Sequence, residues 1–593
     1  RATQLLRQEL YTHAAAKLAE YMVPRAIVVL SGPLPLTANG KVDVRALPAP
    51  TAEDAAGVGA SGVDHTPPRT EVEAELAAAW AQVLGLASVG IHANFFELGG
   101  YSLLAAQLVG IIEARLGVRI GMREVFEAPT VSALANVVAR ATGVAEADKS
   151  VVKIDLAGEV VLPSEICAPA SGEVPRASGA GSFLAPPVVF LTGATGFVGS
   201  FLLAELLANT RAEVKCLVRA SDEASGRARL DVGASKFGLP PPAATYGERV
   251  RVVVGELGPH MFGLTSDAFS VLARSVDVII HNGAGVNFVY PYSALKGPNV
   301  IGTQEVLRLA CFGAIGGDAA TPVHFISTLS TLDTDARVIS ETDVFPRWER
   351  LVSGYSQSKW VGEQIVALAR CERGVPASIY RLGRIAPHSQ TGAGSHDDLL
   401  TRVLKGCVET KFVPSELETL VDFTPVDYAS KAVVELALSG RGLGRDFHIL
   451  NPSPMPLTRL WKLLRRAKYK LYPSSYDGWF RTLLEHARRS DDGVLLPVLL
   501  FFEESGDISG LAGELPPPEL YPKFEVPNSK ELISARCPPV SKQLVDAYVA
   551  AWVAEGFFPS PGAEERSALP AAPAPGGDGG HGKAKQKHKF RLG

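Results

Sequence analysis

The chain has 593 residues, of which 47% are hydrophobic, and its formal net charge is −4 at pH 7. A length of this order corresponds to about three or four domains, and the hydrophobic fraction is large enough for well-packed cores. The small net charge gives no electrostatic reason to expect binding to nucleic acid or to an anionic membrane. Because the chain begins at Arg1 rather than at Met, we expect a fragment truncated at its N-terminus.

The six cysteines are scattered and form no CxxC pair and no spacing typical of a metal site. This pattern indicates reduced thiols and therefore a cytoplasmic protein. The longest apolar run, Val494–Phe502, contains Pro497 and is too short to span a bilayer. We therefore expect neither a metal centre nor a membrane segment.

The first 50 residues predict a helix over 5–21, a strand over 26–30 and a hairpin turn at Asn39-Gly40. The stretch LPLTANGKVDVRALP around that turn resembles the last motif of adenylation domains in nonribosomal peptide synthetases and related adenylate-forming enzymes. In that family the lysine at the position of Lys41 contacts the acyl substrate and phosphate. The nucleotide-binding body of such a domain is missing, so residues 1–50 are expected to be its C-terminal α+β remnant, unable to catalyse adenylation within this chain.

Residues 51–69 read as a linker, and residues 70–142 predict a small helical domain. Amphipathic periodicity places its helices at 72–84, 102–116 and 131–139. By local physics alone Ser102 is a helix N-cap, and such a position tolerates an added phosphate. The surrounding FFELGGYSLL, however, resembles the attachment motif of acyl and peptidyl carrier proteins. That resemblance implies a four-helix carrier domain with 4′-phosphopantetheine on Ser102, added by a phosphopantetheinyl transferase.

Residues 143–186 are again rich in Ala, Gly, Ser and Pro, and they predict a linker that lets a carrier reach a neighbouring active site. A short apolar strand over 188–191 follows, then a glycine turn and an apolar helix, an order typical of a dinucleotide-binding fold. Gly193 permits the tight turn, Gly196 lets the backbone approach a pyrophosphate, and Gly199 lets the helix pack on the strand. We expect the cofactor to contact Gly193, Thr195, Gly196, Phe197, Val198 and Gly199.

Further strands are predicted at 214–218, 251–254, 276–281 and 323–326, and a helix is predicted to open at Asn299. The first of these strands ends at Arg219, where an acidic residue would bind the ribose of NAD and an arginine suits the 2′-phosphate of NADP. Arg229 is a candidate to assist it. Residues after the next two strands complete the predicted cofactor site, namely Glu256, Leu257, Asn282 and Ala284.

The strand over 323–326 runs into Ser327-Thr328, and a Tyr-x-x-x-Lys motif follows at Tyr355 and Lys359. This spacing places the two side chains one turn apart on one face of a helix. A phenol with a pKa of about 10 needs a nearby cation to transfer a proton at neutral pH, and Lys359 can supply it while contacting the nicotinamide ribose. Thr328 is expected to orient the substrate oxygen.

The segments LTGATGFVG, CLVRA, HNGAGVN, STLST, GYSQSKWVGEQ and DFTPVDYASKAV together resemble the extended short-chain dehydrogenase/reductase superfamily. More closely, they resemble the thioester reductase domains of nonribosomal peptide synthetases, α-aminoadipate reductases and carboxylic acid reductases. The resemblance implies a Rossmann-type, doubly wound parallel sheet over 187–452 that binds NADP, and a smaller substrate-side region over 453–560. Departures are Glu256, where Asp is usual, and Gly283-Ala284-Gly285, where alanine is more frequent. Residues 561–593 predict a disordered tail.

The combined resemblance implies NADPH-dependent reduction of an acyl or peptidyl thioester carried on Ser102. Thr328 and Tyr355 would stabilise the oxyanion, and Tyr355 would donate a proton to give a hemithioacetal that collapses to an aldehyde. Reduction onward to an alcohol stays open. Upstream adenylation, condensation or synthase domains are the expected source of the substrate.

Several alternatives remain at the level of sequence. An α-aminoadipate reductase-like enzyme is one, and a non-redox, cyclising release module is another. The same fold acting on a free small molecule, and a carrier segment without enzymatic activity, are further possibilities. The attached carrier argues against a free substrate, and the presence of both Tyr355 and Lys359 favours redox chemistry.

Overall fold

The structure is a computed structural model that describes residues 27–29, 66–96, 98–100, 102–118, 120–141, 154–167, 186–287, 290–312, 320–332, 336–351, 353–396, 398–415, 417, 419–489, 499 and 521–561. The predicted hairpin with Lys41, and the tail beyond 561, lie outside these residues. Residues 27–29 are described but carry no strand, because none of the described strands pairs with them. The strand predicted over 26–30 is therefore not seen at these three residues.

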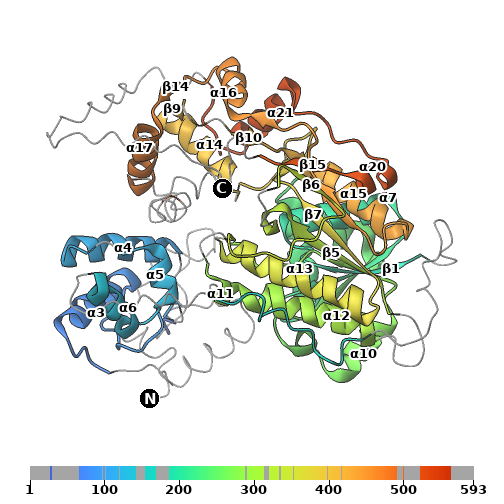
Figure 1. Ribbon diagram of the computed structural model, residues 1–593, viewed down its shortest axis with the longest axis horizontal. Helices are drawn as coiled ribbons and strands as arrows, with labels where there is room; N and C mark the ends of the chain where they lie inside the picture. The colour runs from blue at the N-terminus through green and yellow to red at the C-terminus, as the bar shows by residue number, and fades with distance from the viewer. Residues whose placement is uncertain are drawn as a thin grey trace, which may run out of the picture.

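The carrier-like unit consists of α3 (Glu71–Leu84), α4 (Ser102–Leu116), α5 (Met122–Glu127) and α6 (Val131–Ala141), drawn in blue in Figure 1. Thr70 caps α3, because its side-chain oxygen accepts a hydrogen bond from the Glu73 N–H. Trp80 and Phe95 are fully buried in the core, with ring centroids 5.0 Å apart. The three predicted helices are confirmed, and α5 is the fourth helix that the resemblance implied without a position.

A seven-stranded sheet forms the centre of the second unit, with strand order β12-β7-β5-β4-β1-β2-β3 and every pair parallel. Its strands are β1 (Val188–Thr192), β2 (Glu213–Val218), β3 (Val250–Val254), β4 (Val278–His281), β5 (Val323–Thr328), β7 (Ala377–Leu382) and β12 (Asp446–Ile449). The order reverses between β1 and β4, and doubly wound sheets bind ligands at the carboxyl ends of strands at such a point. The predicted fold class and the five predicted strands are confirmed.

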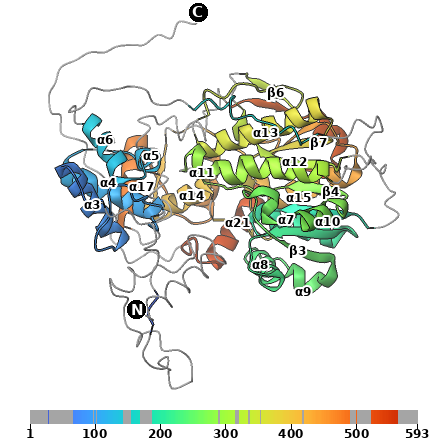
Figure 2. The same ribbon diagram turned by 90° about the horizontal axis from the view of Figure 1, so that it is seen from below.

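Helices cover both faces of this sheet, as Figures 1 and 2 show. On one face α7 (Phe197–Asn209) packs against α15 (Val426–Ser439) over a core that includes Leu206 and Val433. The other face carries α10 (Ser266–Arg274), α12 (Gly302–Phe312) and α13 (Gly354–Arg373). Burial on both faces explains why the strands read as continuous apolar runs.

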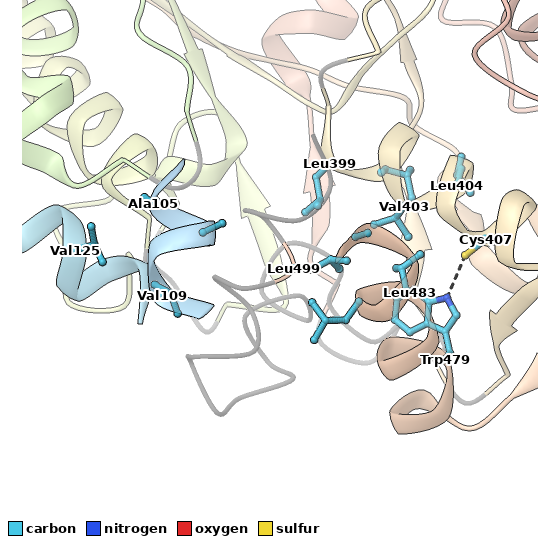
Figure 3. Close-up of a cluster of buried hydrophobic side chains, with 14 of the residues drawn as sticks. Ala105, Val109, Val125, Leu399, Val403, Leu404, Cys407, Trp479, Leu483 and Leu499 are labelled. Atoms are coloured by element: carbon cyan, nitrogen blue, oxygen red, sulfur yellow. Dashed lines mark hydrogen bonds between the residues drawn. The ribbon is translucent and has the colours of Figure 1, made fainter. Parts of the chain in front are cut away.

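A smaller subdomain lies beside the sheet unit, and its buried apolar residues form one cluster with those of the carrier-like helices, apart from the clusters that pack the sheet. Its elements are α14 (Leu399–Thr410), β9 (Phe412–Pro414), β10 (Leu420–Val421), β13 (Met455–Pro456), α16 (Leu457–Arg466), β14 (Tyr472–Ser474), α17 (Tyr476–Arg489) and α21 (Lys542–Ala554). Figure 3 shows Trp479 donating its indole N–H to the sulfur of Cys407 at 3.2 Å, in the same cluster as Leu404 and Leu483. The remaining short elements are α8 (Glu223–Ser235), α9 (Pro242–Tyr246), α11 (Tyr292–Lys296), β6 (Val338–Ser340), β8 (Ile385–Ala386), β11 (Thr424–Pro425), β15 (Lys523–Glu525) and α20 (Pro527–Leu532).

The predicted division at residue 452 differs from this subdomain in two ways. Helix α14 precedes the division, and yet its buried residues cluster with those of α16, α17 and α21. Conversely, β15 pairs with β6, and α20 packs beside β12, so residues 523–532 return to the sheet unit. The buried Glu341 carboxylate holds residues 528 and 529 in this position, because it accepts hydrogen bonds from the Asn528 N–H at 2.7 Å and from the Ser529 hydroxyl.

Within the described part of the chain, no helix combines the length and the hydropathy that crossing a membrane requires.

Candidate active site

Packing requires two glycines where β1 leads into α7, one in the connecting turn and one in the first turn of the helix. Gly193 has φ of 73°, and a Cβ there would lie 2.7 Å from the Cα of Gly283. A Cβ on Gly199 would lie 2.0 Å from the carbonyl oxygen of Gly193. At Gly196, by contrast, the one atom within 4 Å of a Cβ would be that same oxygen, at 3.4 Å. A side chain at Gly196 would therefore make one ordinary contact, so packing leaves room for a ligand to approach the backbone there.

The first turn of α7 has features of an anion site. Gly196 is its N-cap and supplies no side-chain acceptor, whereas α8 begins with an Asp222 side chain that accepts from the Ser225 N–H. The first N–H groups of α7 and the positive end of its dipole thus face the carboxyl edge of the sheet without a capping side chain. The turn therefore fits the diphosphate of a dinucleotide.

Contacts at the ends of β1 and β4 bring the predicted cofactor residues together. Asn282 donates from Nδ2 to the Gly193 carbonyl at 3.4 Å, and the N–H of Gly283 donates to Thr192 Oγ1 at 2.8 Å. The Leu257 side chain closes the same region, since its Cδ1 would lie 2.8 Å from a Cβ on Gly283. Ala284 follows, half-buried.

Arg219 stands directly after β2, with its Nη1 3.4 Å from Glu256 Oε1. Arg229 of α8 donates to the Arg219 carbonyl at 2.5 Å, so the three predicted residues are neighbours. The Arg219 and Glu256 side chains are 52% and 54% exposed. Because an exposed pair of this kind contributes only about 0–1 kcal/mol, the guanidinium can exchange its partner for a phosphate at little cost.

Lys359 lies on α13 and is 4% exposed. Its Nζ donates to the Ile326 carbonyl at 2.7 Å and lies 4.2 Å from the centre of the Phe325 ring. Burial lowers the pKa of Lys359 to about 7, and the Glu363 carboxylate opposes that change. The Lys359 side chain can therefore change between its ammonium and amine forms near neutral pH.

Tyr355 and Thr328 lie on the two elements that Lys359 joins. Tyr355 is half-buried in the first turn of α13, one turn before Lys359, where Ser353 caps the helix by accepting from the Ser356 N–H. Thr328 ends β5, the strand that Lys359 contacts, and its Oγ1 accepts from the Ser330 N–H at 3.3 Å. The hydrogen bond from Lys359 to β5 thus ties the helix of Tyr355 to the strand of Thr328.

Asn299 is a buried residue that sequence reasoning did not assign to the site. Its Oδ1 accepts from the Gly285 N–H at 2.6 Å, while its Nδ2 donates to the Gly285 carbonyl and to Ser358 Oγ at 2.8 Å. Asn299 therefore joins the end of β4 to α13.

The prediction that a helix opens at Asn299 is wrong: a π-helical turn over Gly297–Ile301 runs from α11 into α12. This wider turn takes up Pro298 within a longer helical run.

Two further buried groups lie near the predicted catalytic residues. His281 lies between Thr192 Oγ1 at 2.8 Å and Thr303 Oγ1 at 3.2 Å, and burial, with a smaller effect of Lys359, lowers its pKa to about 3. It is therefore neutral. Glu363 accepts from Thr331 at 3.2 Å and pairs with Arg381 at 2.7 Å. Its place four residues after Lys359 is a signal that could have identified it.

Comparisons with known proteins agree with this geometry. The family model described as male sterility protein, with an NAD-binding domain, matches residues 191–433, and the model of the phosphopantetheine attachment site matches 74–138. A linear gramicidin synthase protein of Brevibacillus parabrevis is 39% identical over 480 residues, which are 80% of this chain and 9% of that protein. The L-2-aminoadipate reductase large subunit of Candida glabrata is 32% identical over 514 residues, which are 82% of this chain and 36% of that protein.

Among solved structures, the terminal R domain from the myxalamid PKS-NRPS biosynthetic pathway is 34% identical, with a TM-score of 0.61. The similarity covers 69% of this chain and 100% of that one. The chain therefore spans a whole R domain but only 9% and 36% of the two curated relatives.

Proposed function

Because the chain belongs to the carrier–reductase family that includes the terminal R domains of nonribosomal peptide synthetases, we propose that it reduces a carrier-bound acyl thioester with NADPH. The observation that carries the proposal is the union, in one chain, of a phosphopantetheine attachment domain and an NAD(P)-binding reductase site with Tyr355 and Lys359 on α13. A free-standing dehydrogenase would need no carrier, and a carrier alone would need no reductase site.

Different residues of the chain bind different parts of the cofactor. The first turn of α7 binds the diphosphate, and Arg219, with Arg229 behind it, binds the 2′-phosphate that distinguishes NADP from NAD. Leu257, Asn282 and Ala284 border the cofactor at the ends of β3 and β4. When bound, NADPH supplies the hydride.

Tyr355 and Thr328 act on the oxygen of the thioester carbonyl. Both hydroxyls donate hydrogen bonds to that oxygen as negative charge develops on it, and Tyr355 then gives up its proton. The Lys359 ammonium stabilises the phenolate that remains. The acyl group leaves as an aldehyde and the phosphopantetheine arm regains its thiol.

The carrier half of the proposal assigns the attachment site to Ser102, the first residue of α4. A phosphopantetheinyl transferase modifies it, and upstream synthetase domains load the acyl or peptidyl chain. The six cysteines are all free, which suits a reducing compartment such as the cytoplasm.

Tyr355→Phe tests the chemistry with a synthetic acyl-pantetheine thioester, which needs no carrier. Loss of the proton donor is expected to lower NADPH oxidation by about 10²–10⁴-fold. The matched control is Tyr246→Phe, which keeps the ring that packs 5.6 Å from the Arg249 guanidinium and should turn over normally. Near-normal oxidation by Tyr355→Phe would remove Tyr355 from the mechanism, and no NADPH oxidation by the unaltered chain with any thioester would overturn the proposed function.

A further inference from the structure

Residues 154–167, here named the strap, fall inside the segment that reads as a free linker, yet they are packed on the reductase. Leu156 near one end and Ile166 near the other are both 0% exposed, and they belong to the same apolar core as α12 and α13. Burial of an aliphatic side chain contributes about 1.5–3 kcal/mol, so two such anchors hold both ends of a 14-residue segment.

Polar contacts fix the strap to α11. Glu159 Oε2 accepts from the Tyr292 hydroxyl at 2.8 Å and pairs with Lys296 Nζ at 2.6 Å. The Lys296 ammonium and, more weakly, the Tyr292 hydroxyl hold the pKa of Glu159 below its usual range. The carboxylate therefore remains charged and paired at neutral pH.

Further contacts fix the strap to α12. Gln304 donates from Nε2 to the Val161 carbonyl at 2.7 Å, and Arg308 pairs with Glu165 at 2.7 Å. At the last residue of the strap, Cys167 approaches the buried Cys311 of α12, where burial and then Cys167 raise the pKa of the Cys311 thiol to about 12. The strap thus follows the surface of the reductase from α11 along α12.

The carrier domain meets the same end of the reductase. Phe126 of α5 lies with its ring centroid 5.3 Å from that of Tyr290, two residues before α11. Figures 1 and 2 both show the carrier helices beside α11. The point where the strap is fixed to α11 and the point where the carrier makes contact are therefore close together.

We infer that the strap is a fixed part of the reductase, so that the carrier is tethered by residues 142–153 alone. The tether then has 12 residues in place of the 44 of the predicted linker over 143–186. Effective concentration falls with about the −3/2 power of tether length, so the strap raises the local concentration of the thioester by about sevenfold. The inference uses the proposed function only as its readout.

Two insertions of the same flexible Gly/Ser sequence, about 30 residues long, test this directly. One is placed within 142–153, before the strap, and the other within 168–185, after it. The full chain is loaded with an acyl group through its phosphopantetheine, and NADPH oxidation is followed in a single turnover. The insertion before the strap is expected to slow that turnover about sixfold, because the tether grows from 12 to about 42 residues. The insertion after the strap should leave the rate unchanged, because the strap before it and β1 after it are both fixed to the reductase.

Equal effects of the two insertions, including no effect of either, would overturn the inference. Turnover of free acyl-pantetheine should be the same in both variants and in the unaltered chain; a failure there concerns the proposed function and not the strap. Hydrogen exchange supplies a second measurement, since the N–H groups of Glu159, Val160 and Ile166 donate to carbonyls within the strap. Slow exchange across 154–167 is expected, and exchange as fast as that of an unfolded peptide would overturn the inference as well.

Discussion

Lys359 is the residue whose protonation state most directly controls the proposed proton transfer. Burial lowers the pKa of Lys359 to about 7, because its ammonium has exchanged water for the Ile326 carbonyl and the face of Phe325. The cation is therefore present below about pH 7 and is lost as the pH rises above it. Without the cation, the Tyr355 phenol is a poor proton donor.

This predicts that kcat/KM for NADPH, which reports on the free enzyme, falls about tenfold per pH unit above about pH 7. Lys359→Arg keeps the positive charge at every accessible pH, so this fall should disappear even if the overall rate is lower. The measurement is turnover of free acyl-pantetheine between about pH 6 and about pH 9. Superimposable profiles for the two proteins would show that Lys359 does not titrate in this range.

Among single residues, the sequence predicts the pairs that lie close together in the chain. Tyr355 and Lys359 are four positions apart, so helical periodicity alone places them on one face. Asn299 and His281 act through partners 14 to 89 positions away, namely Gly285, Ser358 and Thr192. No pattern in the chain indicates those pairings, because only the folded sheet and its helices bring the partners together.

At the scale of elements, Gly196 and Gly199 differ although both belong to one glycine motif. Gly199→Ala places a methyl group 2.0 Å from a backbone oxygen, so α7 must move away from β1. We expect a loss of about 1–3 kcal/mol or more in the free energy of unfolding, together with loss of NADPH binding. Gly196→Ala meets that oxygen at 3.4 Å and should change the stability by less than about 1 kcal/mol.

NADPH binding by Gly196→Ala should nevertheless weaken by about tenfold or more, because the methyl group would occupy the space where we propose that the diphosphate approaches. Thermal unfolding and fluorescence titration with NADPH separate the two effects. An unchanged affinity in Gly196→Ala would mean that the diphosphate lies elsewhere.

The sequence predicts elements that have an apolar pattern of their own. It does not predict elements whose position depends on residues far away in the chain. The strands over 188–191 and 323–326 are buried on both faces, so continuous apolar runs mark them, and the structure extends them only to Thr192 and Thr328. By contrast, β15 is the three-residue segment Lys-Phe-Glu, too short and too polar to show a period. Its place beside β6 depends on the buried Glu341 and on Asn528, which lie 187 positions apart.

At the scale of the whole molecule, composition predicts a linker between two domains but not what the middle of that segment does. Residues 143–186 are rich in small residues and proline, which is typical of a linker. Leu156 and Ile166 are exceptions in that background, and their burial is what turns the middle of the segment into the strap. Whether an isolated apolar residue in a linker is buried depends on a matching surface elsewhere in the fold, and here that surface is provided by α11, α12 and α13.

Because the carrier holds the substrate and the reductase converts it, Ser102→Ala should abolish turnover of a carrier-loaded substrate and leave turnover of free acyl-pantetheine intact. Ser102→Ala keeps α4, since alanine is a good helix former, but removes the hydroxyl proposed to accept phosphopantetheine. Treatment with a phosphopantetheinyl transferase and coenzyme A should then give no mass increase, and turnover of a carrier-loaded substrate should be lost. Turnover of free acyl-pantetheine should stay within about twofold, because α4 packs in a different buried cluster from β5 and α13, which carry Thr328, Tyr355 and Lys359.

The matched control for this variant is Ser132→Ala, which removes a serine hydroxyl from the start of α6. That hydroxyl accepts a hydrogen bond from Arg69 at 2.9 Å on the carrier surface, so its loss should cost little stability and leave the modification intact. Modification of Ser102→Ala by the transferase would place the attachment site on another residue. A loss of free-thioester turnover in Ser102→Ala would instead show that the carrier takes part in the reductase site itself, and the separation of loading from reduction would have to be abandoned.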